Sequence, residues 1–282
     1  MTAADRPADA EPVPARSVQI SGAQAMPGRL VIDEPRPGVA RLTISHPGKR
    51  GALNTTIIDQ LFEAFTTLDA RCVVLTGEGT AFSAGFDLDQ LRSTPTPDAV
   101  ERLVTEHLNP ALEVIAAYKY PTIAAINGHA IGAGLELALA CDLRIGAEDA
   151  RFGMPPGTLG LVYSPSGVRR FIETIGAART RELFLTGGRI DAATGLHWGL
   201  LNRVATAHQV GEAALALADD IAAHAPLAQM GNKRVIRAVS RTLTAEDEEE
   251  LRQLRTASFG SEDFREGLRA IAERRSPRWS GR

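Results

Sequence analysis

The sequence predicts an α/β fold with a helical C-terminal region, and two observations support this prediction. Short apolar segments of strand character alternate with helical patterns from residue 29 to about residue 206, which is typical of α/β proteins. From residue 207 onward every segment has the apolar spacing of a helix. We therefore expect a disordered tail at 1–28, an α/β core at 29–206 and a helical region at 207–282.

The first elements of the core are expected to be a hairpin, a helix and a strand. Apolar residues at 29–33 and 39–45 flank a turn at 35–38 that is rich in proline and glycine, so they should pair as a β-hairpin. The segment 54–68 carries apolar residues at helical spacing. Residues 72–75 form a short apolar run that predicts a buried strand.

The later elements continue the alternation and then end in helices. A long helix is expected at 98–118, where Pro110 should kink or split it because proline lacks an N–H and clashes with the preceding turn. Strands are expected at 122–126, 143–145 and 200–204, with an apolar helix ending at Cys141 between the first two, and the closing helices at 213–223, 227–239, 245–257 and 262–274.

The composition argues against several classes of function. A net charge of −3 and an aromatic content of 5% indicate neither nucleic acid nor an anionic membrane as a partner. No apolar run approaches the roughly 20 residues that span a bilayer. No histidine or cysteine cluster has metal-ligand spacing, so no metal is expected.

Residues 1–28 lack the apolar segment of a signal peptide, and two cysteines in apolar runs fit a reducing cytoplasm.

A glycine- and alanine-rich segment at 127–134 is the first candidate for a site. It joins the strand expected at 122–126 to an apolar helix. Small residues allow a ligand to approach the backbone, and the first N–H groups of a helix lack internal partners. A developing oxyanion is a natural occupant, although tight packing alone explains such a turn equally well.

Glu136 makes this segment more informative. It lies in a helix that is otherwise apolar and should be buried, where a carboxylate is costly unless it is paired or used. One interpretation is a general acid or base whose pKa is raised by desolvation. The other is a structural carboxylate held by a buried arginine. Because Glu136 lies one helical turn after Ala133, it could face whatever the Ala133 N–H binds.

A second segment of small residues, 81–85, leads into another probable helix. Asp87, with Gln90 three residues later, resembles a capping box. For Asp87 a plain N-cap role is therefore the alternative to any role in binding.

Several motifs together resemble the crotonase, or enoyl-CoA hydratase/isomerase, superfamily. They are FSAGFDL at 82–88, NGHAIGAGLELA at 127–138, FGMP at 152–155, LTGGRI at 185–190 with GL at 199–200, and SEDFREG at 261–267. The resemblance covers residues 29–282. It implies a crotonase-like spiral of ββα turns, a C-terminal helical trimerisation region, and a homotrimer or hexamer. It also implies acyl-CoA thioester substrates, with coenzyme A as part of the substrate and no separate cofactor.

The resemblance also assigns roles to individual residues. It places the backbone donors of an oxyanion hole at Phe86 and Ala133, and a catalytic acid/base at Glu136. Ala133 stands where the family more often has glycine, but alanine still offers its N–H.

The CoA-binding stretch of the family matches residues 49–54. Lys49 or Arg50 would then lie near phosphates, which cationic side chains suit, although a solvated basic pair is the simpler alternative. Ala52, Ala84 and Asp87 fall at further CoA-binding positions. Near the C-terminus, Arg274 or Arg275 could reach the CoA phosphate of a neighbouring subunit.

One position departs from the family. Hydratases of this superfamily use a second glutamate after the position of Pro155, and this chain has Pro156 there, which cannot move a proton. Tyr163 matches a substrate-contacting tyrosine of methylmalonyl-CoA decarboxylases in the same superfamily, or is simply an interfacial aromatic. The leading hypothesis is therefore an enoyl-CoA hydratase/isomerase-type enzyme, and the alternatives are a methylmalonyl-CoA-type decarboxylase and a non-catalytic acyl-CoA-binding protein.

Overall fold

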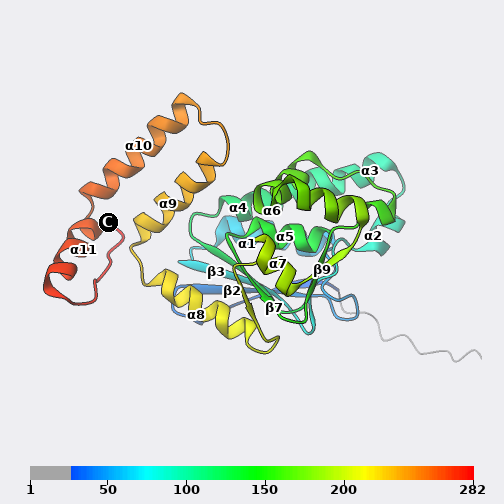
Figure 1. Cartoon of the computed structure of the whole chain (residues 1–282), viewed down its shortest axis with the longest axis horizontal. Coiled ribbons are helices and arrows are strands. Elements are labelled where there is room, and N and C mark those ends of the chain that lie inside the picture. The colour runs from blue at the N-terminus through cyan, green and yellow to red at the C-terminus, as the bar shows by residue number, and fades with distance from the viewer. Residues whose placement is uncertain (1–26) are drawn as a thin grey trace, which may run out of the picture.

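The computed structural model describes residues 27–282, which form two β-sheets and a set of helices (Figure 1). The α/β prediction is confirmed. The expectation of a disordered tail at 1–28 lies outside the described residues, except at Pro27 and Gly28.

The larger sheet has six strands in the order β1-β2-β3-β5-β7-β10. They are β1 (Arg29–Arg36), β2 (Val39–Ser45), β3 (Cys72–Gly77), β5 (Thr122–Ile126), β7 (Leu143–Ala147) and β10 (Arg203–Ala205). Strands β1 and β2 form the predicted antiparallel hairpin, and the remaining neighbours are parallel. Parallel strands with both faces covered have continuous apolar sequences. For this reason β3 and β5 could be predicted from the sequence.

The smaller sheet has four strands in the order β4-β6-β8-β9. They are β4 (Ala81–Ser83), β6 (His129–Ile131), β8 (Arg151–Gly153) and β9 (Arg189–Asp191). Each of β4, β6 and β8 directly follows a strand of the larger sheet and precedes a helix, so successive ββα turns stack on one another. Strands of three residues are too short to show alternation, and none of them was expected from the sequence.

Helices fill the connections and the C-terminal region. They are α1 (Thr55–Thr67), α2 (Leu88–Ser93), α3 (Pro97–Arg102), the π-helix η1 (Leu103–Leu108), α4 (Asn109–Ala117), α5 (Ala133–Ala140), the 3₁₀-helix η2 (Pro156–Leu159), α6 (Pro165–Thr186), α7 (Ala192–Trp198), α8 (Val210–Ala222), α9 (Pro226–Val239), α10 (Ala245–Gly260) and α11 (Glu262–Glu273). Helix α6 was not expected from the sequence, and its helical geometry is interrupted at Gly176.

The long helix expected at 98–118 is divided as Pro110 suggests. Between α3 and α4 the chain forms one π-helical segment that ends just before Asn109 and Pro110. A proline inside a helix removes an N–H donor and crowds the carbonyl four residues earlier. The wider π turn accommodates both effects.

The C-terminal helices differ in how they pack. Helix α8 lies against β3, β5 and β7 and buries Val210, Ala214 and Ala218 in the core. Helices α9, α10 and α11 extend away from the two sheets (Figure 1). Within residues 27–282 no helix combines the length and the apolar character needed to cross a membrane.

Candidate active site

The site is built around α5, whose eight residues are all buried. Alanine and leucine dominate this helix, so it can sit between neighbouring elements without a polar face. Glu136 is the exception, and this residue is only 1% exposed. A carboxylate at this depth must either be matched by donors or remain available for chemistry.

The two segments that carry the expected oxyanion donors lie against each other. Gly85 has a φ of 98°, and a Cβ at this position would lie 2.7 Å from the Ile131 carbonyl oxygen and 3.6 Å from the Ala133 nitrogen. Only glycine allows this approach together with this φ. The residue that precedes Phe86 therefore contacts the start of α5.

Hydrogen bonds on either side of Phe86 fix its backbone. Leu53 N donates to Gly85 O at 2.7 Å, and Asp87 N donates to Leu53 O at 2.8 Å. Within the part of the chain that the structure describes, neither the Phe86 N–H nor the Ala133 N–H donates a hydrogen bond to another residue. The two amides are thus adjacent, held in place and available to an acceptor.

The two oxygens of Glu136 have different surroundings. Oε2 accepts a hydrogen bond from the Tyr163 hydroxyl. Oε1 lies 3.8 Å from Arg170 Nε, which is too long for a hydrogen bond. Both Oε1 and Arg170 Nε are buried and have no hydrogen-bond partner among residues 27–282. A Cβ on Gly167 would lie 2.9 Å from Oε1, so the first turn of α6 fits closely over the carboxylate.

Burial raises the pKa of Glu136 above its ordinary value. The hydrogen bond from Tyr163 and the charge of Arg170 act in the opposite direction, and Glu113 adds to the rise. Burial and the nearby Glu136 also raise the pKa of Tyr163 well above its ordinary value, so Tyr163 keeps its proton at neutral pH. The arginine of the structural interpretation is present: Arg170 forms an ion pair with Glu136 at 3.8 Å but no hydrogen bond.

Pro156 lies buried at the start of η2 and offers no group that titrates. Two further residues, Arg170 and Glu113, belong to the surroundings of Glu136 but were not expected from the sequence. Arg170 is on α6, for which no helix was predicted, and Glu113 is one of many carboxylates on predicted helices. Nothing in the local sequence of either residue marks it as a neighbour of Glu136.

The residues expected to bind CoA lie together beside Phe86. Lys49 Nζ pairs with Asp87 at 2.8 Å and with Asp89 at 2.9 Å. Asp87 is the N-cap of α2 and accepts from the Asp89 N–H, so the N-cap interpretation is confirmed. The capping box does not form, because Gln90 instead accepts from the Thr55 N–H.

Arg50 differs from Lys49 in its conformation and in its partners. Its φ of 49° is uncommon for a residue other than glycine, and such conformations often occur at functional sites. Its carbonyl accepts a hydrogen bond from Ala84 N at 3.0 Å. The side chain is exposed and has no ion pair within the described residues, whereas Lys49 has two. Ala52 is buried next to it.

The two arginines near the C-terminus also have different surroundings. Arg275 pairs with Glu266 at 2.5 Å and with Glu273 at 2.6 Å. Arg274 ends α11 with a φ of 53°.

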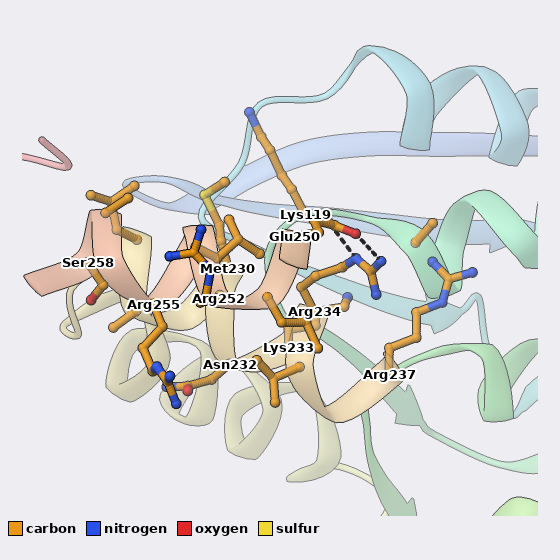
Figure 2. Close-up of a pocket in the computed structure, with 18 of the residues that line it drawn as sticks. Lys119, Met230, Asn232, Lys233, Arg234, Arg237, Glu250, Arg252, Arg255 and Ser258 are labelled. Atoms are coloured by element: carbon orange, nitrogen blue, oxygen red, sulfur yellow. Dashed lines mark hydrogen bonds and ion pairs between the residues drawn. The ribbon is translucent and has the colours of Figure 1, made fainter. Parts of the chain in front are cut away.

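Two cavities of 800 Å³ or more border α9, away from the Phe86 and Ala133 amides. One of about 800 Å³ separates α9 and α10 from residues 116–119, and Figure 2 shows Arg234 and Glu250 paired within it. The other, of about 900 Å³, is bordered by Glu113, Arg170 and Arg237.

Comparison with known proteins assigns the chain to a family. The model of the enoyl-CoA hydratase/isomerase family matches residues 34–282. A 2,3-dehydroadipyl-CoA hydratase of Escherichia coli is 34% identical over 252 residues, covering 86% of this chain and 96% of that protein. A carnitinyl-CoA dehydratase of Proteus mirabilis is 35% identical over 257 residues, covering 88% and 97%.

A solved structure agrees with the sequence relatives. The crystal structure of an enoyl-CoA hydratase from Bacillus anthracis matches with a TM-score of 0.84 at 31% identity, covering 90% of this chain and all of that one (100%). The chain therefore belongs to the enoyl-CoA hydratase/isomerase family, and the resemblance to the crotonase superfamily is confirmed. It is an acyl-CoA-processing enzyme of the hydratase/isomerase type, and its crotonase-like fold is likewise confirmed.

Proposed function

We propose that this enzyme adds water reversibly to a 2-enoyl-CoA thioester with a single catalytic carboxylate, Glu136. The observation that carries the proposal is the unequal pair of Glu136 oxygens: Tyr163 anchors Oε2, while Oε1 is buried without a hydrogen-bond partner in the described chain. A desolvated carboxylate with a raised pKa is a stronger base than one in water.

The proposed reaction has two steps. Glu136 Oε1 takes a proton from water as the water oxygen bonds to the β carbon, and the electron pair of the C=C bond moves onto the thioester as an enolate. The enolate oxygen accepts hydrogen bonds from the Phe86 and Ala133 N–H groups. Glu136 then returns the proton to the α carbon. Pro156 takes no part, so one carboxylate serves both as base and as acid.

The decarboxylase alternative rests on Tyr163 and on Pro156. In that reaction Tyr163 would hold the carboxylate of a malonyl-type substrate. The single Tyr163 hydroxyl proton is, however, donated to Glu136, and a second anion beside this buried carboxylate would be repelled. These two facts favour hydration.

For the CoA moiety we propose Arg50 as the main phosphate contact. It is the exposed cation of the 49–54 stretch, whereas Lys49 is already neutralised by Asp87 and Asp89. The backbone near Ala52 and Ala84 would border the pantetheine arm, and Asp87 would fix Lys49. Coenzyme A enters as part of the substrate, with no separate cofactor.

We further propose a homotrimer or a dimer of trimers formed through residues 207–282. The C-terminal helices expose large apolar side chains, including Phe259 at 58%, Leu268 at 56% and Ile271 at 78%, and such patches mark interaction sites. Arg274 is then the better candidate for contact with a neighbour's CoA, because Arg275 is occupied by two glutamates. A cytoplasmic location is proposed from the two buried free thiols, Cys72 and Cys141.

A mass-spectrometric screen of CoA esters tests the function. We expect crotonyl-CoA or a longer enoyl-CoA to gain the mass of water and lose its enone absorbance. Loss of CO₂ from methylmalonyl-CoA, with no hydration, would instead support the decarboxylase. A shift in melting temperature without turnover of any ester would support the non-catalytic acyl-CoA-binding protein.

A further inference from the structure

Arg170 on α6 forms ion pairs with two carboxylates but a hydrogen bond with only one of them. Its Nη2 donates to Glu113 Oε1 on α4 at 3.1 Å. Its Nε stops 3.8 Å from Glu136 Oε1 on α5. The Arg170 side chain is 13% exposed, and that of Glu136 is 2% exposed, so solvent screens the second pair little.

This arrangement leaves two buried polar atoms without a hydrogen-bond partner. Within residues 27–282 the buried side-chain atoms that lack a hydrogen-bond partner are Glu136 Oε1 and Arg170 Nε. They lie 3.8 Å from each other. A guanidinium next to a carboxylate normally forms a close, often bidentate, pair. A buried polar group without a partner destabilises the fold, so a specific cause must keep the two atoms apart. The bond from Arg170 to Glu113 supplies that cause.

We propose that Glu113 is a positioning residue that holds the Arg170 guanidinium back from Glu136 and so keeps Oε1 available for the reacting proton. The inference rests on the proposed role of Glu136 as the single acid/base. Without Glu113, the guanidinium would close the gap to Oε1 and occupy the oxygen that should take the proton from water.

The charges around Glu136 fit this role. The titratable and charged groups that face it are Tyr163, Arg170 and Glu113. Arg170 lowers the pKa of Glu136 and Glu113 raises it. Glu113 also accepts from Arg237 Nη2 on α9 through its other oxygen, at 3.3 Å, so the C-terminal region contacts the same carboxylate that positions Arg170.

The substitution Glu113→Ala tests the proposal, and Glu173→Ala is the matched control. Glu173 is a carboxylate on α6 that borders the same cavity as Glu113 and Arg170, and it has no ion pair among the described residues. The measurement is kcat/KM for enoyl-CoA hydration as a function of pH. For Glu113→Ala we expect the acidic limb of the kcat/KM profile to move down by about one pH unit, because a cation within about 4–6 Å favours the charged form of the Glu136 carboxylate. We also expect kcat at neutral pH to fall about tenfold. Glu173→Ala should leave the acidic limb and kcat unchanged.

A second variant and a second readout keep the test decisive. Arg170→Gln removes the cation and should move the acidic limb upward, which separates the proposal from a general loss of packing. Difference infrared spectroscopy of the Glu136 carboxyl, against Glu136→Gln, reports the same shifts without turnover. If no enoyl-CoA is hydrated but the infrared titration shifts as expected, the proposed function fails and the positioning role of Glu113 stands. The role of Glu113 is overturned if the pKa of Glu136 is unchanged or raised in folded Glu113→Ala. It is also overturned if Glu173→Ala shifts the pKa of Glu136 by the same amount.

Discussion

Two buried glutamates, one in the core and one in the C-terminal region, have pKa values that are shifted in opposite directions. Glu136 on α5 is 1% exposed and Glu266 on α11 is 7% exposed. Burial raises the pKa of Glu136, whereas hydrogen bonds from Arg275 lower the pKa of Glu266 to about 2. Two carboxylates with nearly the same exposure therefore differ in the direction of their shift.

The two carboxylates also differ in the number of donors that reach them. Both oxygens of Glu266 are occupied, by Arg275, by Arg269 and by the Arg278 N–H. Glu136 has one donor, Tyr163, and an arginine that stops short of it. A carboxylate that is saturated with donors stabilises a fold, whereas one that lacks a donor on one oxygen remains able to take a proton. Burial is thus the largest influence on the pKa of Glu136, whereas hydrogen bonds from arginine are the largest influence on the pKa of Glu266.

The largest expected effect is from Glu136→Gln. An amide cannot take a proton from water, so hydration of crotonyl-CoA should fall by about a thousandfold. The decay of enone absorbance measures it, and circular dichroism checks the fold. Glu266→Gln is the matched substitution at the other site and should retain turnover. Equal activity of Glu136→Gln and the wild type would remove Glu136 from the mechanism.

Gly85→Ala should have the next largest effect. A methyl group there would meet the Ile131 carbonyl oxygen at 2.7 Å and shift the Phe86 N–H away from its position. Loss of one oxyanion donor lowers kcat by about 100-fold or more. Gly79→Ala is the control, because its φ of 75° is also positive but a methyl group there meets nothing within 4 Å. Similar kcat values for the two variants would argue against an oxyanion hole at Phe86.

Tyr163→Phe should have a smaller effect and a specific pH signature. The hydrogen bond from Tyr163 lowers the pKa of Glu136, so its loss should raise that pKa further. Because the base works in its ionised form, the acidic limb of kcat/KM should move up by about one pH unit, with kcat reduced about tenfold. A loss of kcat much larger than tenfold, with an unshifted acidic limb, would instead place the Tyr163 hydroxyl on the substrate.

Glu266→Gln should change stability alone. The pKa of Glu266 is about 2 in the folded protein against an ordinary value of 4.5, so its contribution is fully present above about pH 4.5 and is lost as the pH falls toward 2. We expect the variant to melt a few degrees below the wild type at pH 7, and the difference to shrink between pH 4.5 and pH 2. A difference in melting temperature that stays constant with pH would contradict the ion-pair account.

Much of the fold was predictable because its signals are local. The β1–β2 hairpin follows from its turn residues, and α1, α9, α10 and α11 follow from apolar spacing. The strands of the smaller sheet were not predictable, since three residues carry no period. Helix α6 was not predicted from the sequence, and its helical geometry is interrupted at Gly176.

The sequence by itself determined the family, the two small-residue turns and the presence of one carboxylate in an apolar helix. These features depend on residues close together in the chain, where spacing alone predicts what lies side by side. Only the tertiary structure decided that Tyr163 bonds to Glu136, 27 residues away, and that Glu113 bonds to Arg170, 57 residues away. Such pairs depend on how α4, α5, α6 and the loop that precedes α6 pack against one another, and local sequence does not encode the distances between them.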